Sequence, residues 1–153
     1  MKKCVIMRGI PGAGKSMWVR IEKAGCDGGF YTVSADSFFT RPTGEYVFDS
    51  AKLSEAHNQC LGDFLGFCIT GMNSKSPHTL VVDNTNVRLF EIAPYYRIAE
   101  AFGYSVQIVW VVCDVQKAIA RNVHGVPANA IETMAKSFEP IPHFWNQTIV
   151  IGG

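Results

Sequence analysis

The chain has 153 residues, of which 48% are hydrophobic and 18% are charged. This length and composition suit one compact domain that needs neither disulfides nor structural metal ions, so we expect a single domain over residues 1–153. The 14 basic and 13 acidic residues leave a formal net charge of +1, which excludes a broad basic surface for long nucleic acids and leaves only local contacts with them.

The predicted elements alternate along the chain. Apolar runs predict strands over residues 4–7, 30–34, 79–83, 104–114 and 147–151. Helical spacing predicts helices over residues 15–25, 51–72, 88–103, 115–125 and 127–139. Residues 35–49 are predicted to be irregular, and Pro94 is expected near the first turns of its helix. This order predicts an α/β fold with a central parallel sheet flanked by helices.

A phosphate-binding loop joins the first strand to the first helix. Its glycines let backbone N–H groups converge on phosphate oxygens, and the helix that follows presents the positive end of its dipole. Lys15 is predicted to contact the β- and γ-phosphates, and the Ser16 hydroxyl to bind Mg²⁺. The sequence therefore predicts binding of ATP or GTP at the residues that match GxxxxGK[ST], which are Gly9, Ile10, Pro11, Gly12, Ala13, Gly14, Lys15 and Ser16.

Asp36 follows the second predicted strand, at the edge where ligand-binding loops of parallel α/β sheets gather. A carboxylate there can orient an acceptor hydroxyl and accept its proton, so Asp36 is our candidate general base; the alternative is a capping or turn aspartate. Phe38 and Phe39 are candidates for stacking on a nucleobase, with Arg41 as a phosphate contact. At least one of the two phenylalanines is expected to pack inward instead.

Asp83 ends the third predicted strand, the position from which an acid completes a magnesium site in such folds. We expect it to act on the metal through water, the alternative being a capping role. Arg88, at the start of the next helix, is either a further phosphate contact or a solvated helix residue.

Arg121 lies on the fourth predicted helix, before the turn NVHGVP. An arginine there is a candidate lid residue that binds the nucleotide and supplies positive charge during transfer, with Lys117 one turn earlier as an assistant. The alternative is a solvated helix residue. The four histidines lack metal-ligand spacing, and His124, within the turn, is expected to be a turn residue.

The cysteines and the first residues indicate the compartment. The five cysteines form no CxxC pair and lie mostly among apolar residues, as buried reduced thiols do. The apolar run of residues 4–7 is too short for a signal peptide or a membrane span. We expect a cytoplasmic protein, in the host cytoplasm if a phage encodes it, with no membrane association and no stable protein partner.

Four stretches occur in this order: RGIPGAGKS, SADSFF, VVDNTNV and ARNVHGVP. In combination they resemble the P-loop kinases related to bacteriophage 5′-polynucleotide kinase, and still more the kinase domain of the animal ubiquitin-ligase-binding proteins of that group. The resemblance runs from about residue 3 to residue 139. It implies a P-loop kinase fold with a small helical lid and ATP-dependent phosphorylation of a nucleic-acid hydroxyl. The residues it implicates are Lys15 and Ser16 in the loop, Asp36 as base and Arg121 in the lid.

Two departures concern the acceptor and the metal. The phage enzyme has an arginine three residues after its catalytic aspartate, which grips the acceptor's phosphate, and this chain has Phe39 there. Its SDTN is replaced by DNTN, so Asn84 stands where an acid is expected and Asp83 lies one place earlier.

Three classes of function follow. The leading hypothesis is a phosphotransferase that uses ATP and Mg²⁺ and acts on a DNA or RNA hydroxyl, most typically the 5′-hydroxyl of a strand. A variant is phosphorylation of a hydroxymethyl group on a modified base, such as 5-hydroxymethyluracil in phage DNA. The second class is a small-molecule kinase for a nucleoside, sugar or antibiotic, and the third is a nucleotide-dependent binding module.

Overall fold

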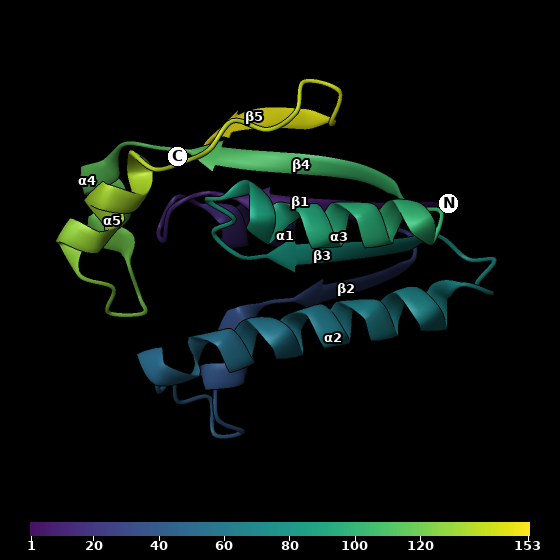
Figure 1. Cartoon of the computed structure of the whole chain (residues 1–153), viewed down its shortest axis with the longest axis horizontal. Coiled ribbons are helices and arrows are strands. Elements are labelled where there is room, and N and C mark those ends of the chain that lie inside the picture. Colours follow the sequence, from purple (N-terminus) through teal and green to yellow (C-terminus); the bar gives the residue numbers. More distant parts are fainter.

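In the computed structural model, which describes residues 1–153, five strands form one sheet in the order β2-β3-β1-β4-β5 (Figure 1). Every neighbouring pair is parallel. The strands are β1 (Lys2–Arg8), β2 (Gly29–Val33), β3 (His78–Asp83), β4 (Ser105–Val112) and β5 (Gln147–Ile151). The α-helices are α1 (Lys15–Ala24), α2 (Leu53–Gly71), α3 (Leu89–Ala101), α4 (Val115–Arg121) and α5 (Ala128–Ala135).

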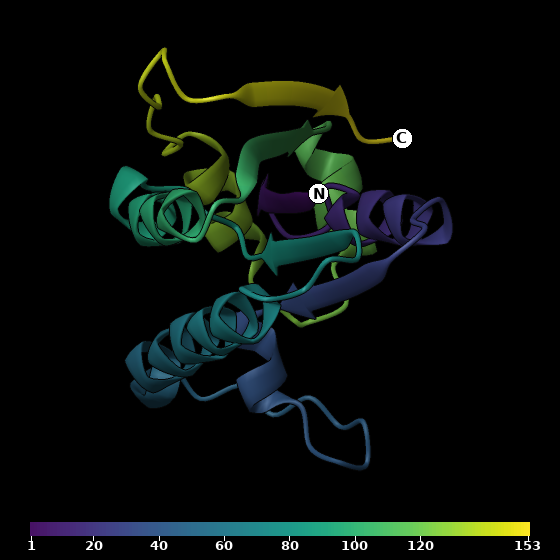
Figure 2. The same ribbon diagram turned by 90° about the vertical axis from the view of Figure 1, so that its right-hand side faces the viewer.

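The sheet is buried on both faces, as its near-continuous apolar strands require. Alternate residues of β1 enter different cores, because successive side chains of a strand point to opposite faces. Cys4 and Ile6 join the cluster with α2 and α3, whereas Val5 and Met7 join the cluster with α1, α4 and α5. Figure 2 shows α2 and α3 on one side of the sheet and α1 on the other. This arrangement confirms the predicted parallel α/β fold.

The segment after β2 is more regular than predicted. Ala35–Phe39 form a 3-10 helix, η1, which begins where the Ser34 hydroxyl accepts a hydrogen bond from the Asp36 N–H. A tight hairpin follows, with an antiparallel bridge between Thr40 and Tyr46. A second 3-10 helix, η2 (Ser50–Lys52), leads into α2. Short polar caps of this kind leave no apolar periodicity in the sequence, which is why the segment was predicted to be irregular.

The remaining sequence expectations concern one helix, the thiols and the membrane. Pro94 lies in the second turn of α3 at an exposed position, so the hydrogen bond that it cannot donate is lost near the start of the helix. All five cysteines are free thiols, and Cys4, Cys60 and Cys68 are buried. None of the helices has both the length and the apolar character to cross a membrane.

Candidate active site

The loop between β1 and α1 is shaped by close backbone approaches. Gly12 has a φ of +80°, and a Cβ on it would lie 2.1 Å from the carbonyl oxygen of Ala118 in α4. Gly14, with a φ of +112°, is the N-cap of α1, and no side chain caps that helix. The first N–H groups of the helix are therefore free to bind an anion, and there is no room for a Cβ at Gly9 or Gly12.

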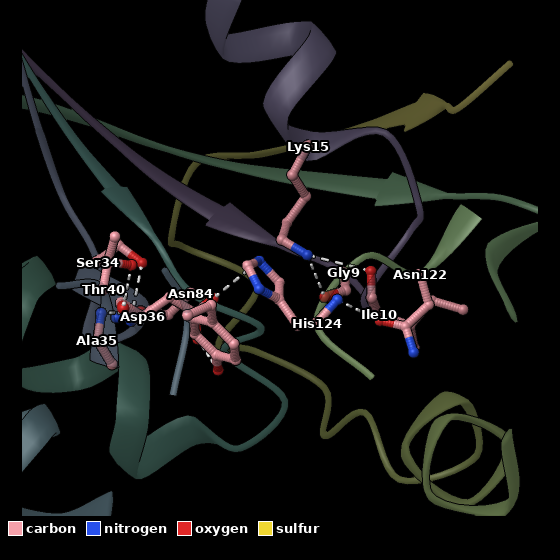
Figure 3. Close-up of polar contacts among 11 residues, drawn as sticks. Gly9, Ile10, Lys15, Ser34, Ala35, Asp36, Thr40, Asn84, Asn122 and His124 are labelled. Atoms are coloured by element: carbon pink, nitrogen blue, oxygen red, sulfur yellow. Dashed lines mark hydrogen bonds and ion pairs between the residues drawn. The ribbon is translucent and has the colours of Figure 1, made fainter. Parts of the chain in front are cut away.

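The side chain of Lys15 lies within the loop between β1 and α1. Its Nζ donates hydrogen bonds to the carbonyl oxygens of Gly9 and Ile10, at 2.9 and 3.1 Å (Figure 3). Burial lowers the pKa of Lys15, and the negative charges of Asp83 and Asp36 act in the opposite direction. The ammonium group is hydrogen-bonded only to carbonyls of its own loop, which suits a group that binds phosphate.

Asp83 and Ser16 are the residues available for a divalent cation. Asp83 is the last residue of β3, and burial raises its pKa while the charge of Lys15 lowers it. No group of three Asp, Glu, His or Cys residues in the chain is arranged to hold a metal ion. Mg²⁺ in kinase sites takes one or two protein ligands together with phosphate and water oxygens, so a carboxylate and a hydroxyl are the donors that it would need from the protein.

Asn84 holds η1 in place. Its Oδ1 accepts a hydrogen bond of 2.9 Å from the backbone N–H of Ala35, and its Nδ2 lies 3.6 Å from the Sγ of Cys60. The side chain is nearly buried, and it both accepts and donates. A carboxylate at this position would lose the donor, which gives a physical reason for the amide in DNTN. Asn84 thereby positions Asp36, the next residue after Ala35.

Each carboxylate oxygen of Asp36 has one side-chain neighbour. The hydroxyl of Tyr46 donates to Oδ1 at 3.1 Å, and Nε2 of His124 lies 3.8 Å from Oδ2 (Figure 3). The rings of Tyr46 and His124 pack together with centroids 4.3 Å apart. Burial and the nearby charge of Asp36 raise the pKa of Tyr46 to about 12, so this phenol keeps its proton at neutral pH. From the sequence, Tyr46 is open between base stacking and core packing, as Phe38 and Phe39 are, and His124 is expected to be a turn residue.

Arg121 is placed apart from Asp36. Its guanidinium donates to the carbonyl oxygens of Lys117 and of the C-terminal Gly153. The lid residue that the structure brings to Asp36 is His124, which lies three positions further along the chain. The signal for it in the sequence is weak: it is the one ionisable side chain in the turn between α4 and α5.

A cleft of about 570 Å³ opens beside Asp36, and it also contains Arg88 and Glu91 at the start of α3 and polar residues of α5. Arg88 is exposed, and its Nη1 lies 3.7 Å from the carboxylate of Glu139. This cleft, lined by Asp36, Arg88, Glu91, Asn129 and Thr133 among others, is called the acceptor cleft below.

The two phenylalanines after Asp36 differ in exposure. Phe39 is 5% exposed and belongs to the core, as expected for at least one of the pair, although its edge still reaches the acceptor cleft. Phe38 is half-buried, packs edge-on against Phe39 with centroids 5.2 Å apart, and lines a smaller cleft of about 220 Å³ with Arg41. Arg41 also forms an exposed ion pair of 3.3 Å with Glu45.

Arg8, directly before the phosphate-binding loop, was not singled out from the sequence. It is fully buried beside the stacked rings of Trp110 and Phe138, with its guanidinium carbon 5.0 and 5.1 Å from their centroids. Its guanidinium donates to three carbonyl oxygens at 2.7–2.8 Å, which belong to Asn86, Val87 and Glu139. This side chain thus connects the end of β1 to the loop after β3 and to the segment after α5, two walls of the site.

Comparison with known proteins gives a family match and relatives that include two mammalian proteins. The family AAA_33, described as an AAA domain, matches residues 4–141. Human NEDD4-binding protein 2 is 28% identical over 143 residues, which cover 88% of this chain and 8% of that protein. Mouse 2′,3′-cyclic-nucleotide 3′-phosphodiesterase is 30% identical over 108 residues, or 71% of this chain and 23% of that protein. The chain therefore spans less than a quarter of either relative.

Among solved structures, the Mycobacterium tuberculosis APS kinase CysC in complex with AMPPNP and APS has the same fold. The TM-score is 0.61 at 16% sequence identity, and the match covers 97% of this chain and 88% of that one. At this identity the likeness concerns the fold alone.

Proposed function

This chain belongs to the AAA domain family AAA_33 and has the fold of the P-loop kinases, and from that premise we propose that it is an ATP-dependent kinase that phosphorylates a hydroxyl group of nucleic acid. The 5′-hydroxyl of a strand is the acceptor that we propose. The observation that carries the proposal is the place of Asp36: it lines the acceptor cleft and its charge also acts on the amine of Lys15.

The nucleotide side of the site binds and neutralises charge. The uncapped N–H groups of α1 and the amine of Lys15 bind the β- and γ-phosphates of ATP. Ser16 and Asp83 would hold Mg²⁺, which would supply positive charge to neutralise the phosphates. The solved kinase of the same fold that contains AMPPNP supports the choice of an adenine nucleotide.

The acceptor side supplies the base. The carboxylate of Asp36 accepts the proton of the acceptor hydroxyl as the oxygen forms its bond to the γ-phosphorus, while the bond from that phosphorus to the bridging oxygen breaks and ADP leaves. Most of the rate enhancement then comes from alignment and charge neutralisation. Arg121 would supply positive charge in this step after its guanidinium leaves the carbonyl oxygen of Gly153 and turns to the phosphates.

A nucleic-acid acceptor is supported by the chemistry of the cleft. Arg88 offers one guanidinium for an acceptor phosphate. In this proposal it does what the phage enzyme does with the arginine that it carries at the position of Phe39. The half-buried ring of Phe38 and the guanidinium of Arg41, in the adjoining cleft, suit a neighbouring base and phosphate. One of the relatives is named for its action on a 2′,3′-cyclic nucleotide.

The test offers γ-labelled ATP with four acceptors in parallel: 5′-hydroxyl DNA and RNA oligonucleotides, a hydroxymethyluracil-containing duplex, and free nucleosides. We expect label in an oligonucleotide, and alkaline phosphatase should remove it. Label in the hydroxymethyluracil duplex alone would move the acceptor to the modified base. Label in the nucleosides alone, or in none of the four, would contradict a nucleic-acid acceptor.

Arg88→Ala tests the proposed phosphate contact. We expect the KM for a 5′-hydroxyl oligonucleotide to rise about tenfold, the loss of one exposed charge-assisted hydrogen bond, while the KM for ATP stays the same. Arg20→Ala is the matched control, because Arg20 is exposed on α1 and lines neither cleft. Equal acceptor KM values for the two variants would remove Arg88 from the site.

A further inference from the structure

The turn between α4 and α5 is built to present one ring. The side chain of Asn122 accepts a hydrogen bond of 3.2 Å from the His124 N–H and donates one of 2.7 Å to the carbonyl oxygen of Val126. Gly125, with a φ of +68°, turns the chain back toward α5. Figure 3 shows the ring of His124 pointing from this turn to Asp36, between Asp36 and the loop that holds Lys15.

The ring meets Asp36 together with Tyr46. Tyr46 donates to one carboxylate oxygen, and Nε2 of His124 approaches the other. The two partners come from different segments, Tyr46 from the hairpin after η1 and His124 from the turn between α4 and α5, and their rings pack together. The other charged groups that face this point are Lys15 of α1 and Asp83 of β3, and the charge of His124 lowers the pKa of Asp83.

This contact is too exposed to serve mainly as a stabilising ion pair. The side chain of His124 is 38% exposed and that of Asp36 is 55% exposed. Exposed pairs of this kind contribute little to folding. A carboxylate with a hydrogen bond at one oxygen and an imidazole 3.8 Å from the other is nevertheless restricted in its rotation, and orientation is what a general base needs.

We propose that His124 is a positioning residue: its Nε2–H, together with the Tyr46 hydroxyl, orients the Asp36 carboxylate toward the acceptor hydroxyl, so that the general base is complete only when the lid lies against it. This inference rests on the proposed role of Asp36. In this proposal, His124 rather than Arg121 is the lid residue that orients the Asp36 carboxylate.

The test separates hydrogen bonding from packing. His124→Phe keeps a ring to pack on Tyr46 but has no donor, whereas His124→Gln keeps an N–H donor of similar reach but has no ring. With labelled ATP and a 5′-hydroxyl oligonucleotide, we expect kcat to fall about tenfold in His124→Phe and to recover most of that loss in His124→Gln, with the KM for ATP unchanged in both. The reverse order, or wild-type kcat in both variants, would overturn the inference.

A second measurement needs no acceptor. If His124 rests on Asp36, amide hydrogen exchange of residues 122–126 should rise several-fold in Asp36→Ala, and exchange in α2 should not change. Unchanged exchange of the lid turn would overturn the inference by itself. Failure of the proposed function is a different result, in which Asp36→Asn retains normal transfer or the wild-type protein labels no oligonucleotide.

Discussion

The nucleotide side and the acceptor side of the site are built in different ways. On the nucleotide side, the backbone shapes the site. The glycines have positive φ angles, the first N–H groups of α1 are uncapped, and the Ala118 carbonyl of α4 lies where a Cβ on Gly12 would clash with it. On the acceptor side, side chains from η1, the hairpin, α3 and the lid meet around one carboxylate. We expect substitutions on the nucleotide side to act sterically and to be severe, and substitutions on the acceptor side to be graded and kinetic.

Gly12→Ala should give the largest effect. The new Cβ would meet the Ala118 carbonyl oxygen at 2.1 Å, and the φ of +80° is unfavourable for alanine. We expect affinity for an ATP analogue to fall at least about 100-fold, or about 3 kcal/mol, when it is measured by calorimetry.

Gly66→Ala is the matched control for Gly12→Ala. A Cβ on Gly66, inside α2, meets nothing within 4 Å. We expect nucleotide affinity to stay the same and the free energy of unfolding to rise by about 0.5–1 kcal/mol, because alanine restricts the unfolded chain and favours the helix. Equal nucleotide affinities for the two variants would break the contrast between the two sides.

Asn84→Ala should have a smaller effect and one confined to transfer. It removes the acceptor of the Ala35 N–H, so η1 and Asp36 lose their anchor while the phosphate-binding loop keeps its contacts. We expect kcat to fall about tenfold and the KM for ATP to stay within about twofold, with a stability loss of about 1–2 kcal/mol. Asn58→Ala, exposed on α2, is the control. A large change in ATP binding would show that the two sides are not separable.

The smallest expected effect is the dependence of folding stability on the protonation of His78, a residue that lines neither cleft. His78, at the amino end of β3, packs against Tyr31 and Tyr104. Burial, and then the charge of Lys2, lower its pKa from the ordinary 6.5. Below pH 6.5 the unfolded chain therefore binds a proton at His78 more readily than the folded chain does. The free energy of unfolding has its full value above pH 6.5 and declines as the pH falls below it.

Thermal unfolding of the wild type and of His78→Phe between pH 8 and pH 5 measures this effect. The variant should lose part of the decline and keep full kinase activity. A wild-type stability that rises with acidification over this range would contradict the assigned direction of the His78 pKa.

The sequence predicts the fold well because the signals are local. Apolar runs fall on all five strands, and the loop from Gly9 to Ser16 predicts a phosphate site, because the positive φ angles and close approaches at Gly9 and Gly12 require glycine. The order of strands and helices then fixes a parallel sheet whose carboxyl ends gather Asp36 and Asp83.

The acceptor side was predicted less completely, because its contacts join distant segments. Nothing local distinguishes the buried Arg8 from an exposed arginine, and its role depends on rings and carbonyls more than 75 residues away. The choice between Arg121 and His124 depends on the direction of a turn, and only the structure brings His124 to Asp36. Phe39 belongs to the core and Asp36 is exposed, although both lie within η1.

Asp36→Asn tests the central claim most directly. The amide keeps the size of the side chain and an oxygen for Tyr46, while it removes the base and replaces the oxygen near Nε2 of His124 with an N–H donor. We expect the dissociation constant of an ATP analogue to stay within about twofold while transfer of label from ATP falls about 100-fold or more. Transfer at the wild-type rate in this variant would contradict the account, because the proton of the acceptor would then have to leave by another route.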